Sequence, residues 1–347
     1  MIPNAAELLL QVRQIHASIR ESVIAACERQ TTEALSTIIT EQAGDAVFAI
    51  DRIAEEALLK HFSVLGQNRS FLLIAEGLGE SGIATFPAGL NATDAELRIL
   101  IDPIDGTRGL MYQKRAAWIL TGIAPNRGPR TSVTDIELAV QTEIPLLKQH
   151  LCDSLWAITG QGAFGERYNR LTGERTPLLP QPSRATTILQ GYGNIARFFP
   201  GNRAELAQID DELIERVLGP RVFEKPQAFE DQYISTGGQL YELMMGHDRW
   251  VADLRSALAV RTGVQTGLCC HPYDICTELI AREAGVIVTN EQGRPIAVPL
   301  DVFTDLSWIG YANQVLEKQL APALQTLLAE HGLLVTTNSM TSSVDEG

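Results

Sequence analysis

Two short apolar runs, each ending in an acidic residue, constrain this chain more than any other feature. One run covers residues 71–75 and is followed by Glu76, and the other covers 97–101 and is followed by Asp102. Runs of this length and composition are typical of buried strands. Carboxylates that follow neighbouring strands can converge in one crevice at the carboxyl edge of a sheet. We therefore expect a mixed α/β fold with an acidic site at that edge.

The second run continues into the hexapeptide Asp102-Pro103-Ile104-Asp105-Gly106-Thr107. Proline fixes its own backbone angle, so the chain turns and both carboxylates can face one point. Two carboxylates 4 Å apart repel each other by about 4 kcal/mol at an effective dielectric constant near 20, unless a cation lies between them. The candidate ligands are all oxygens, which suit Mg²⁺, Mn²⁺ or Ca²⁺ rather than Zn²⁺. The alternative is an ordinary surface turn, since Asp-Pro, Asp-Gly and Gly-Thr pairs favour turns.

Three further residues extend this candidate site. Gly106 lets the backbone approach a ligand closely, and exposed N–H groups there can hold a phosphate. Thr107 adds a hydroxyl that can orient a water molecule. Asp274 lies at the start of an expected helix, where an acidic residue is either a ligand or a cap worth about 1 kcal/mol. We favour the ligand because the hexapeptide is present.

Apolar periodicity predicts the remaining elements. Helices are expected over residues 8–26, 50–58, 203–218, 273–284 and 314–331, with another beginning near Gly238. Asp45 and Asp51 are placed at the start of the second helix. Strands are expected over 117–124, 136–142, 155–159, 187–190, 286–289 and 307–311. Prolines between 177 and 182 indicate a junction, which divides the chain into subdomains 1–184 and 185–335 and a disordered tail, 336–347.

Composition excludes several classes of protein. The chain has 347 residues and a formal net charge of −14, which argues against a nucleic-acid polymer as partner. It shows neither a signal peptide nor an apolar run long enough for a membrane helix. The five cysteines are an odd number in a large chain, so we expect no disulfide framework and a reduced, cytoplasmic protein.

The motifs together resemble those of the inositol monophosphatase-like family. Residues 102–107 look like its first signature, and Tyr273-Asp274-Ile275-Cys276 with Glu283-Ala284-Gly285 is similar to the second. Residues 44–47 with Asp51, residues 74–76 and the hairpin 160–164 resemble three further elements, all in family order. The resemblance implies a layered αβαβα sandwich of two subdomains, of mixed α+β class. It also implies a Mg²⁺-dependent phosphatase, often dimeric, that hydrolyses a small phosphomonoester such as an inositol, polyol or sugar phosphate.

The resemblance also assigns roles to residues. One Mg²⁺ would be held by Glu76, Asp102 and the carbonyl of Ile104, and a second by Asp102, Asp105 and Asp274. Two such ions about 3.5–4 Å apart clamp the attacking and leaving oxygens; a third, weaker ion would use Glu76, and Mn²⁺ is an alternative metal. The nucleophile would be a metal-activated water, which Thr107, paired with Asp45, would orient or deprotonate. Glu76 would share in catalysis, and Gly106, Thr107 and Asp274 would bind substrate.

Three departures from the family pattern leave alternatives open. Gly77 stands where the family often has a second acid, and Glu41 stands where a lysine is common. Residues 249–270 look like an insertion near the site. The substrate could instead be a 3′(2′),5′-bisphosphate nucleotide or fructose 1,6-bisphosphate, and Arg108 gives some support to the nucleotide. A member that has lost catalysis and binds phosphate or metal is the third hypothesis.

Two other motifs are given less weight. Residues 160–165 match the Gly-x-Gly-x-x-Gly dinucleotide pattern, but the following segment is polar and a β-hairpin turn is favoured. Cys269, Cys270, His271 and Cys276 lack the paired spacing of a zinc site, so they are interpreted as core residues.

Overall fold

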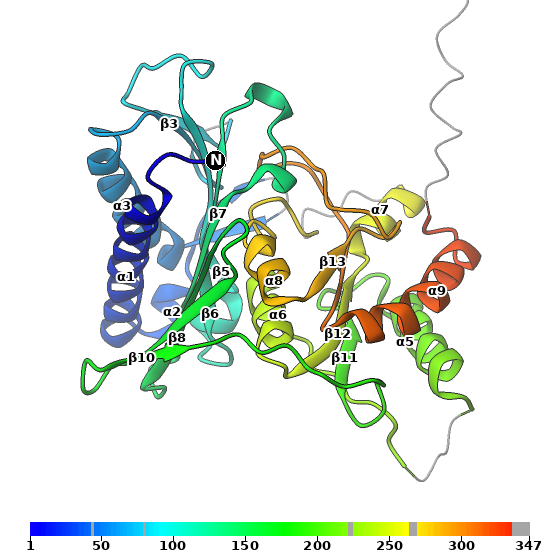
Figure 1. Cartoon of the computed structure of the whole chain (residues 1–347). Coiled ribbons are helices and arrows are strands. Elements are labelled where there is room, and N and C mark those ends of the chain that lie inside the picture. Colours follow the sequence, from blue (N-terminus) through cyan, green and yellow to red (C-terminus); the bar gives the residue numbers. More distant parts are fainter. Residues whose placement is uncertain (43–44, 79–80, 221–224, 264–268, 335–347) are drawn as a thin grey trace, which may run out of the picture.

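A computed structural model describes residues 1–42, 45–78, 81–220, 225–263 and 269–334, with only the backbone described at 40–42 and 45–47. Figure 1 shows five layers: helices, a large sheet, helices, a small sheet and helices. The layered αβαβα sandwich of mixed class is thus confirmed. The division at residue 184 stays a prediction, and the tail 336–347 lies outside the described residues.

The first layer covers one face of the large sheet (Figure 1). It contains helices α1 (Ala5–Arg29), α2 (Thr32–Leu35) and α3 (Ala49–Leu65), with a small hairpin of β1 (Ile38–Gln42) and β2 (Asp45–Phe48). Buried Leu, Val and Ile side chains on one stripe of α1 pack on this sheet. His16 lies within that stripe and is fully buried, with Nε2 2.7 Å from Thr121 Oγ1 and Nδ1 3.0 Å from Thr142 Oγ1. Burial lowers the pKa of His16 to about 3.

The large sheet has eight strands in the order β10-β9-β8-β7-β6-β5-β3-β4. They are β3 (Phe71–Ile74), β4 (Ile83–Phe86), β5 (Leu97–Asp105), β6 (Ala117–Pro125), β7 (Leu138–Ile144), β8 (Leu151–Ile158), β9 (Ala163–Asn169) and β10 (Arg175–Leu178). Strands β3 and β5 are parallel neighbours, with Ile74 opposite Leu100. Glu76, which follows β3, and Asp102, which lies within β5, are therefore close to level with each other on neighbouring strands. The sequence predicted this proximity but ended the second strand before Asp102.

Short helical segments interrupt the connections of this half. They are α4 (Thr107–Met111) and two 3₁₀ turns, Gly128–Arg130 and Val133–Asp135. The Gly160–Gly165 motif forms the β8–β9 turn, so the hairpin interpretation is confirmed. Gly160 and Gly162 have positive φ angles of 76° and 84°. Their N–H groups donate to Oε1 and Oε2 of Glu283, each at 2.8 Å, and one carboxylate thus holds the turn against helix α8.

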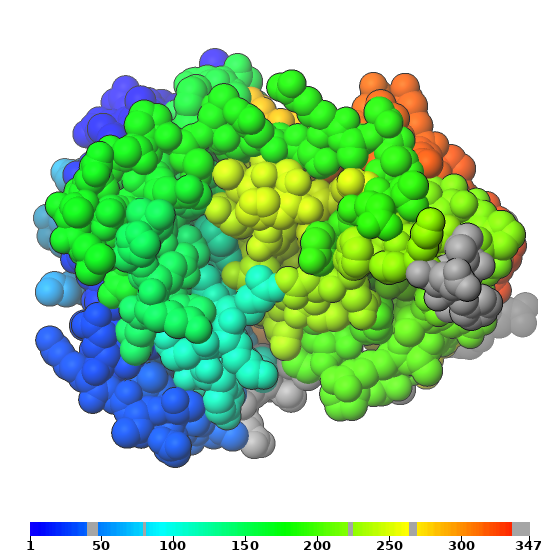
Figure 2. Space-filling model, turned by 90° about the horizontal axis from the view of Figure 1, so that it is seen from below, coloured from blue at the N-terminus to red at the C-terminus, as the bar shows by residue number. Residues whose placement is uncertain are grey.

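The second half begins after a green segment that crosses between the two sheets, and Figure 2 shows the halves side by side. Helices α6 (Thr236–Met244) and α8 (Glu278–Ala284) lie between the sheets and contact both. The small sheet has the order β11-β12-β14-β13: β11 (Tyr192–Ile195), β12 (Asp248–Asp253), β13 (Ile287–Thr289) and β14 (Trp308–Tyr311). The outer helices are α5 (Arg203–Leu218), α7 (Arg255–Thr262) and α9 (Gln314–Glu330).

Two predictions about this half were wrong. No strand forms over 187–190, because Gln190 has a φ of 59° and the chain turns there; the strand is β11 instead. The insertion expected over 249–270 stays a prediction, and its first residues, 249–253, form part of β12, which is paired on both sides. The helix expected from 273 begins at Glu278, because Asp274 closes a turn with His271.

Asp45 also lies elsewhere than predicted. Its backbone is in strand β2, ahead of helix α3, and only Asp51 lies in the first turn of that helix. There the Oδ2 atom of Asp51 accepts the N–H of Phe48 at 2.8 Å, which caps the helix.

Candidate active site

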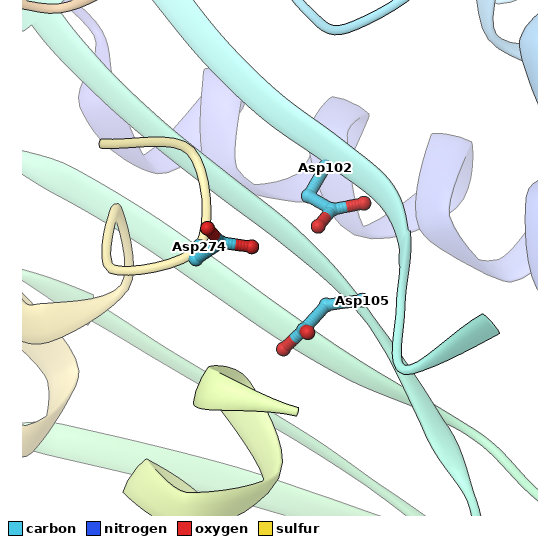
Figure 3. A group of neighbouring side chains, drawn as sticks. All are labelled: Asp102, Asp105 and Asp274. Carbon is cyan, nitrogen blue, oxygen red and sulfur yellow. The ribbon is translucent and has the colours of Figure 1, made fainter. Parts of the chain in front are cut away.

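Three carboxylates converge between the two halves of the molecule. Oxygen atoms of Asp102, Asp105 and Asp274 all lie within 4.8 Å of one another. Figure 3 shows the side chains facing a common space, two from the strand β5 and one from the loop ahead of α8. An arrangement of this kind could hold a metal ion.

A bulge in strand β5 puts two of these acids together. Residues three apart on a regular strand point to opposite faces. Here the pairing with β6 shifts between Asp102 and Asp105, which lie opposite Leu120 and Trp118. The extra residue on β5 reverses the alternation, so the second carboxylate returns to the side of the first. The N–H of Ile104 donates to Asp102 Oδ1 at 2.9 Å and closes the turn.

The start of helix α6 holds Asp105. Its Oδ2 atom accepts the hydroxyl of Ser235 at 2.8 Å and the N–H of Gly237 at 2.6 Å. The Ser235 hydroxyl oxygen in turn accepts the N–H of Gly238 at 2.8 Å and caps the helix. A Cβ on Gly237 would lie 2.5 Å from Leu120 and 2.9 Å from Asp105 Oδ2, so this position requires glycine. A helix was predicted near Gly238, but its contact with the site was not foreseen.

Asp274 reaches the cluster from a turn rather than from a helix. Its Oδ2 atom accepts the N–H of His271 at 2.7 Å, and the backbone N–H of Asp274 donates to the carbonyl of His271. The His271 ring stacks on Tyr273 with centroids 5.2 Å apart. Its Nε2 atom lies 3.2 Å from Asp305 Oδ1. His271 therefore supports the loop that carries Asp274.

The cluster is electrostatically strained without a cation. Burial, followed by the charges of Asp105, Asp274 and Glu76, raises the pKa of Asp102 well above its ordinary value. Burial and the charge of Asp274 raise the pKa of Asp105 to about 8, although the donors from α6 oppose this shift. Both carboxyls thus favour a proton when no metal is bound. A divalent cation would replace that proton and remove the repulsion.

Thr107 lies beside the cluster and its partner is Asp51. The hydroxyl of Thr107 lies 3.0 Å from Asp51 Oδ1 and 2.9 Å from the carbonyl oxygen of Ile104. The pairing of Thr107 with Asp45 cannot be compared, because the side chain of Asp45 lies outside the described residues. The Asp51 contact was not foreseen. A usable signal was that Asp51 lies in the first turn of α3, the helix that follows the motif at residues 44–47.

The remaining predicted residues lie on the same cavity, which has a volume of about 160 Å³. Glu76 is exposed on its wall and is not part of the tight group of three. Gly106 has a φ of 97°, which only glycine adopts readily, and precedes α4. The wall also carries Phe48, Phe198, Phe199, Arg108 and Arg255. None of these aromatic residues was foreseen, since they meet only in the fold.

Other sites considered from the sequence do not form. The five cysteines are free and buried. Within the described ranges, the acidic triad is the sole group of three or more potential ligands, so His271 and its neighbouring cysteines build no zinc site. No helix in the described part of the chain is both long and apolar enough to cross a membrane.

Comparisons with known proteins show where this fold occurs. No family model and no curated protein matches the sequence. Fructose-1,6-bisphosphatase of Leishmania major matches with a TM-score of 0.66 at 15% identity, covering 94% of this chain and 96% of the other. Inositol monophosphatase of Anabaena gives 0.56 at 15%, covering 93% and 97%. A protein described as an inositol monophosphatase–fructose 1,6-bisphosphatase gives 0.60 at 18%, covering 92% and 98%. The chain thus has the inositol monophosphatase-like fold that its motifs predicted.

Proposed function

We propose that this chain is a Mg²⁺-dependent phosphoric monoester hydrolase that acts on a small polyol or sugar phosphate. The observation that carries the proposal is the convergence of Asp102, Asp105 and Asp274 beside the Thr107–Asp51 pair. Three buried or half-buried carboxylates together are costly in an empty site and become favourable around a cation. The solved structures with this fold, which include phosphatases, support the same reaction class.

The donor set fits a hard divalent cation. The three carboxylates, with Glu76 and the Ile104 carbonyl on the same cavity, offer only oxygen atoms. Oxygen donors favour Mg²⁺, with Mn²⁺ as a substitute. We assign Asp102, Asp105 and Asp274 as the main ligands and Glu76 and Ile104 as additional ones. When bound, such ions lower the pKa of a nearby water and neutralise charge on the phosphate oxygens.

The residues of the chain then orient the reactants. Thr107 has one hydroxyl proton, which Asp51 Oδ1 and the Ile104 carbonyl both accept. Its oxygen keeps its lone pairs directed away from these acceptors and can accept a hydrogen from the attacking water. As the water oxygen bonds to phosphorus, its proton passes to the Thr107 oxygen and the hydroxyl proton of Thr107 passes to Asp51 Oδ1. The phosphorus–oxygen ester bond breaks, and the leaving alkoxide takes up a proton from solvent. The N–H groups of Gly106 and Thr107 are proposed to bind the phosphate.

The second candidate substrate carries an additional phosphate or an aromatic base. The guanidinium of Arg108 lies 5.5 Å from the ring of Phe48 and 5.8 Å from that of Phe199. Arg255 lies over Phe198 and Phe199 at 5.0 and 5.6 Å. A wall that alternates cations and rings suits a planar or doubly phosphorylated ligand. This favours keeping fructose 1,6-bisphosphate and 3′(2′),5′-bisphosphate nucleotides in the substrate panel.

Phosphate release from a panel of phosphomonoesters tests the proposal. Inositol, sugar and polyol monophosphates and both kinds of bisphosphate are incubated with protein and Mg²⁺. We expect turnover on at least one monoester. EDTA should abolish it, and so should Asp102→Asn, which removes the carboxylate expected to bind both Mg²⁺ ions. Glu56→Gln, on the exposed side of α3, is the matched control. Mg²⁺ binding without turnover on any substrate would favour the third hypothesis, a non-catalytic phosphate- or metal-binding protein.

A further inference from the structure

One buried guanidinium group of helix α1 has no acidic partner. Arg20 is 3% exposed, and within the described ranges no residue forms an ion pair with it or accepts a hydrogen bond from it. Its guanidinium carbon lies 5.0 Å from the centre of the Tyr168 ring on β9. Arg98 is also buried, but its Nε atom donates to Asn126 Oδ1 at 2.9 Å. Arginine is seldom buried without a partner, so Arg20 is a candidate to bind an anion from outside the chain.

Arg20 lines a pocket of about 220 Å³ beside helix α1. Two further arginines, Arg13 of the same helix and Arg175 of β10, lie on its wall. The guanidinium carbon of Arg13 is 3.7 Å from the ring centre of Trp156. That of Arg175 is 4.7 Å from the centre of the Tyr168 ring, which Arg20 also contacts. Aromatic rings thus hold three guanidinium groups around one small space.

The pocket carries more positive than negative charge. Glu166 is the one acidic residue among the described residues that line it, and its Oε1 atom lies 3.4 Å from Arg13 Nη2 and 2.5 Å from Arg175 Nη1. Burial lowers the pKa of Arg13, with Glu166 opposing this shift and the like charge of Arg175 adding to it. Three guanidinium groups and one carboxylate leave two positive charges unbalanced, although the whole chain has a net charge of −14. A bound dianion would balance them.

The pocket lies away from the candidate active site. Thr142 of β7 and Ser154 of β8 also line it, and their hydroxyl oxygens are 2.9 Å apart. Gln141, next to Thr142, points to the opposite face of the sheet, where its Nε2 atom donates to the carbonyl of Gly237 in α6. The pocket therefore belongs to the face that α1 covers. Among the described residues, it shares none with the cavity of the three aspartates.

We propose that Arg13, Arg20 and Arg175 bind a small oxyanion with two negative charges in this pocket. Planar guanidinium groups bind phosphate and carboxylate oxygens through paired, parallel hydrogen bonds. A phosphate group and a dicarboxylate share this chemistry, and both fit the charge of the pocket. Binding here needs no metal ion, so the site is separate from the proposed hydrolysis.

Calorimetric titration of the metal-free protein with inorganic phosphate tests the proposal. EDTA removes divalent ions, so the acidic cavity repels phosphate and only the arginine pocket attracts it. We expect the unsubstituted chain to bind one phosphate. Arg20→Gln should weaken this binding at least about tenfold, because it removes charged hydrogen-bond donors. Arg175→Gln, at a half-exposed position on the rim, should weaken it as well.

A parallel titration with malonate at the same ionic strength distinguishes the two sources of the anion. Tighter binding of phosphate identifies a phosphoryl ligand, and tighter binding of malonate identifies a dicarboxylate. Arg29→Gln, at an exposed arginine of the same helix outside the pocket, should bind either anion like the unsubstituted chain.

Two results overturn the inference. One is that the unsubstituted chain binds neither anion saturably, and the other is that Arg20→Gln and Arg175→Gln bind with unchanged affinity. Thermal unfolding without ligand checks that each variant is folded, and the rim variant still decides the question if Arg20→Gln does not fold. Turnover with Mg²⁺ is measured separately, so failure of the proposed function would leave this site standing.

Discussion

The carboxylate of Asp105 is held from one side and repelled from the other. Ser235 and Gly237 donate hydrogen bonds to its Oδ2 atom, while Asp274 presents a like charge across the cluster. Burial tips this balance toward the protonated form in the metal-free protein. The single residue therefore links the pH dependence of folding to metal binding.

Metal-free protein should lose stability as the pH rises from about 4 to about 8. The folded-state pKa of Asp105, about 8, lies above its ordinary value of 3.8, so the fold binds this proton more tightly than the unfolded chain does. The contribution is complete below about pH 4 and is lost through pH 8, at about 1.4 kcal/mol per pH unit for one group. Thermal unfolding in EDTA measures it, and Asp105→Asn should flatten the profile. A profile equally steep in both proteins would contradict the assignment.

Thr107→Ala should lower kcat by about 100- to 10,000-fold, the usual effect of losing a group that manages a proton. KM and Mn²⁺ affinity should change little, because the carboxylates remain. Steady-state kinetics with a reactive phosphomonoester and parallel Mn²⁺ titration provide the measurement. Thr107→Ser, which keeps the hydroxyl beside Asp51, should recover most of the activity; no recovery would point to a packing role for the methyl group instead.

Among the elements, helix α1 is fixed to the large sheet by a buried polar contact. His16 reaches Thr121 on β6 and Thr142 on β7 through its two ring nitrogens. The ring is fully buried, and burial lowers its pKa to about 3, so the neutral form is favoured in the folded state. The apolar stripe predicted the helix, but it gave no sign that a histidine would lie within its buried face.

Acid should weaken this contact. The pKa of His16 falls from 6.5 to about 3 on folding, so the unfolded chain takes up a proton first as the pH drops. At pH 5 this group alone should cost about 2 kcal/mol relative to pH 7. His16→Gln should be less stable at pH 7 and should lack this component of the acid sensitivity. Urea unfolding at both pH values tests it; an unchanged difference between them would refute it.

The β8–β9 turn offers a prediction that concerns stability alone. Glu283 accepts two N–H groups from the turn, and hydrogen bonds to a charged acceptor are worth about 1.5–3 kcal/mol. Glu283→Ala should lower the free energy of unfolding by about 2 kcal/mol or more and leave kcat unchanged, since the residue is not on the cavity. Glu137→Ala, at another carboxylate away from the cavity, which contacts the N-terminal residues, is a useful comparison.

Sequence patterns predicted the elements with strong periodicity. They failed for elements whose boundaries or pairing depend on tertiary contacts. The apolar runs before Glu76 and Asp102 identified β3 and β5 because both strands are buried on both faces. The helix start at 273 was wrong because Asp274 bonds back to His271, a contact that competes with helix formation. Strand β12 was not predicted because its pairing with β11 and β14 depends on segments distant in the chain.

The candidate site shows the same limit. Asp102, Asp105 and Asp274 could be named from motifs, and the fold brings them together. The roles of Ser235 and Gly237 could not be predicted. They depend on a close approach between α6 and β5, which no local sequence pattern indicates.

At the scale of the whole molecule, the candidate site joins the two halves. Asp102 and Asp105 belong to the large sheet, and Asp274 comes from the loop ahead of α8, between the sheets (Figures 1 and 3). A cation bound here would bridge both parts. Metal binding should therefore stabilise the complete fold rather than one sheet.

Mg²⁺ at a hundred times its dissociation constant should stabilise the protein by about 2.7 kcal/mol. Asp274→Asn should lose most of this gain, although the variant keeps both carboxylates of β5. Hydrogen exchange should show Mg²⁺ protecting β5 and α8 together in the unsubstituted chain. Protection confined to one of them would contradict a site shared by the two halves.

The separation of these ligands along the chain also has a consequence during synthesis. A nascent chain that has left the ribosome as far as the end of the large sheet carries the two acids of β5 but lacks the third. Helix α6, which holds Asp105, has not yet emerged either. The acids of β5 then lack a complete set of ligands. Assembly of the site is therefore a late event of folding, completed when the loop ahead of α8 docks.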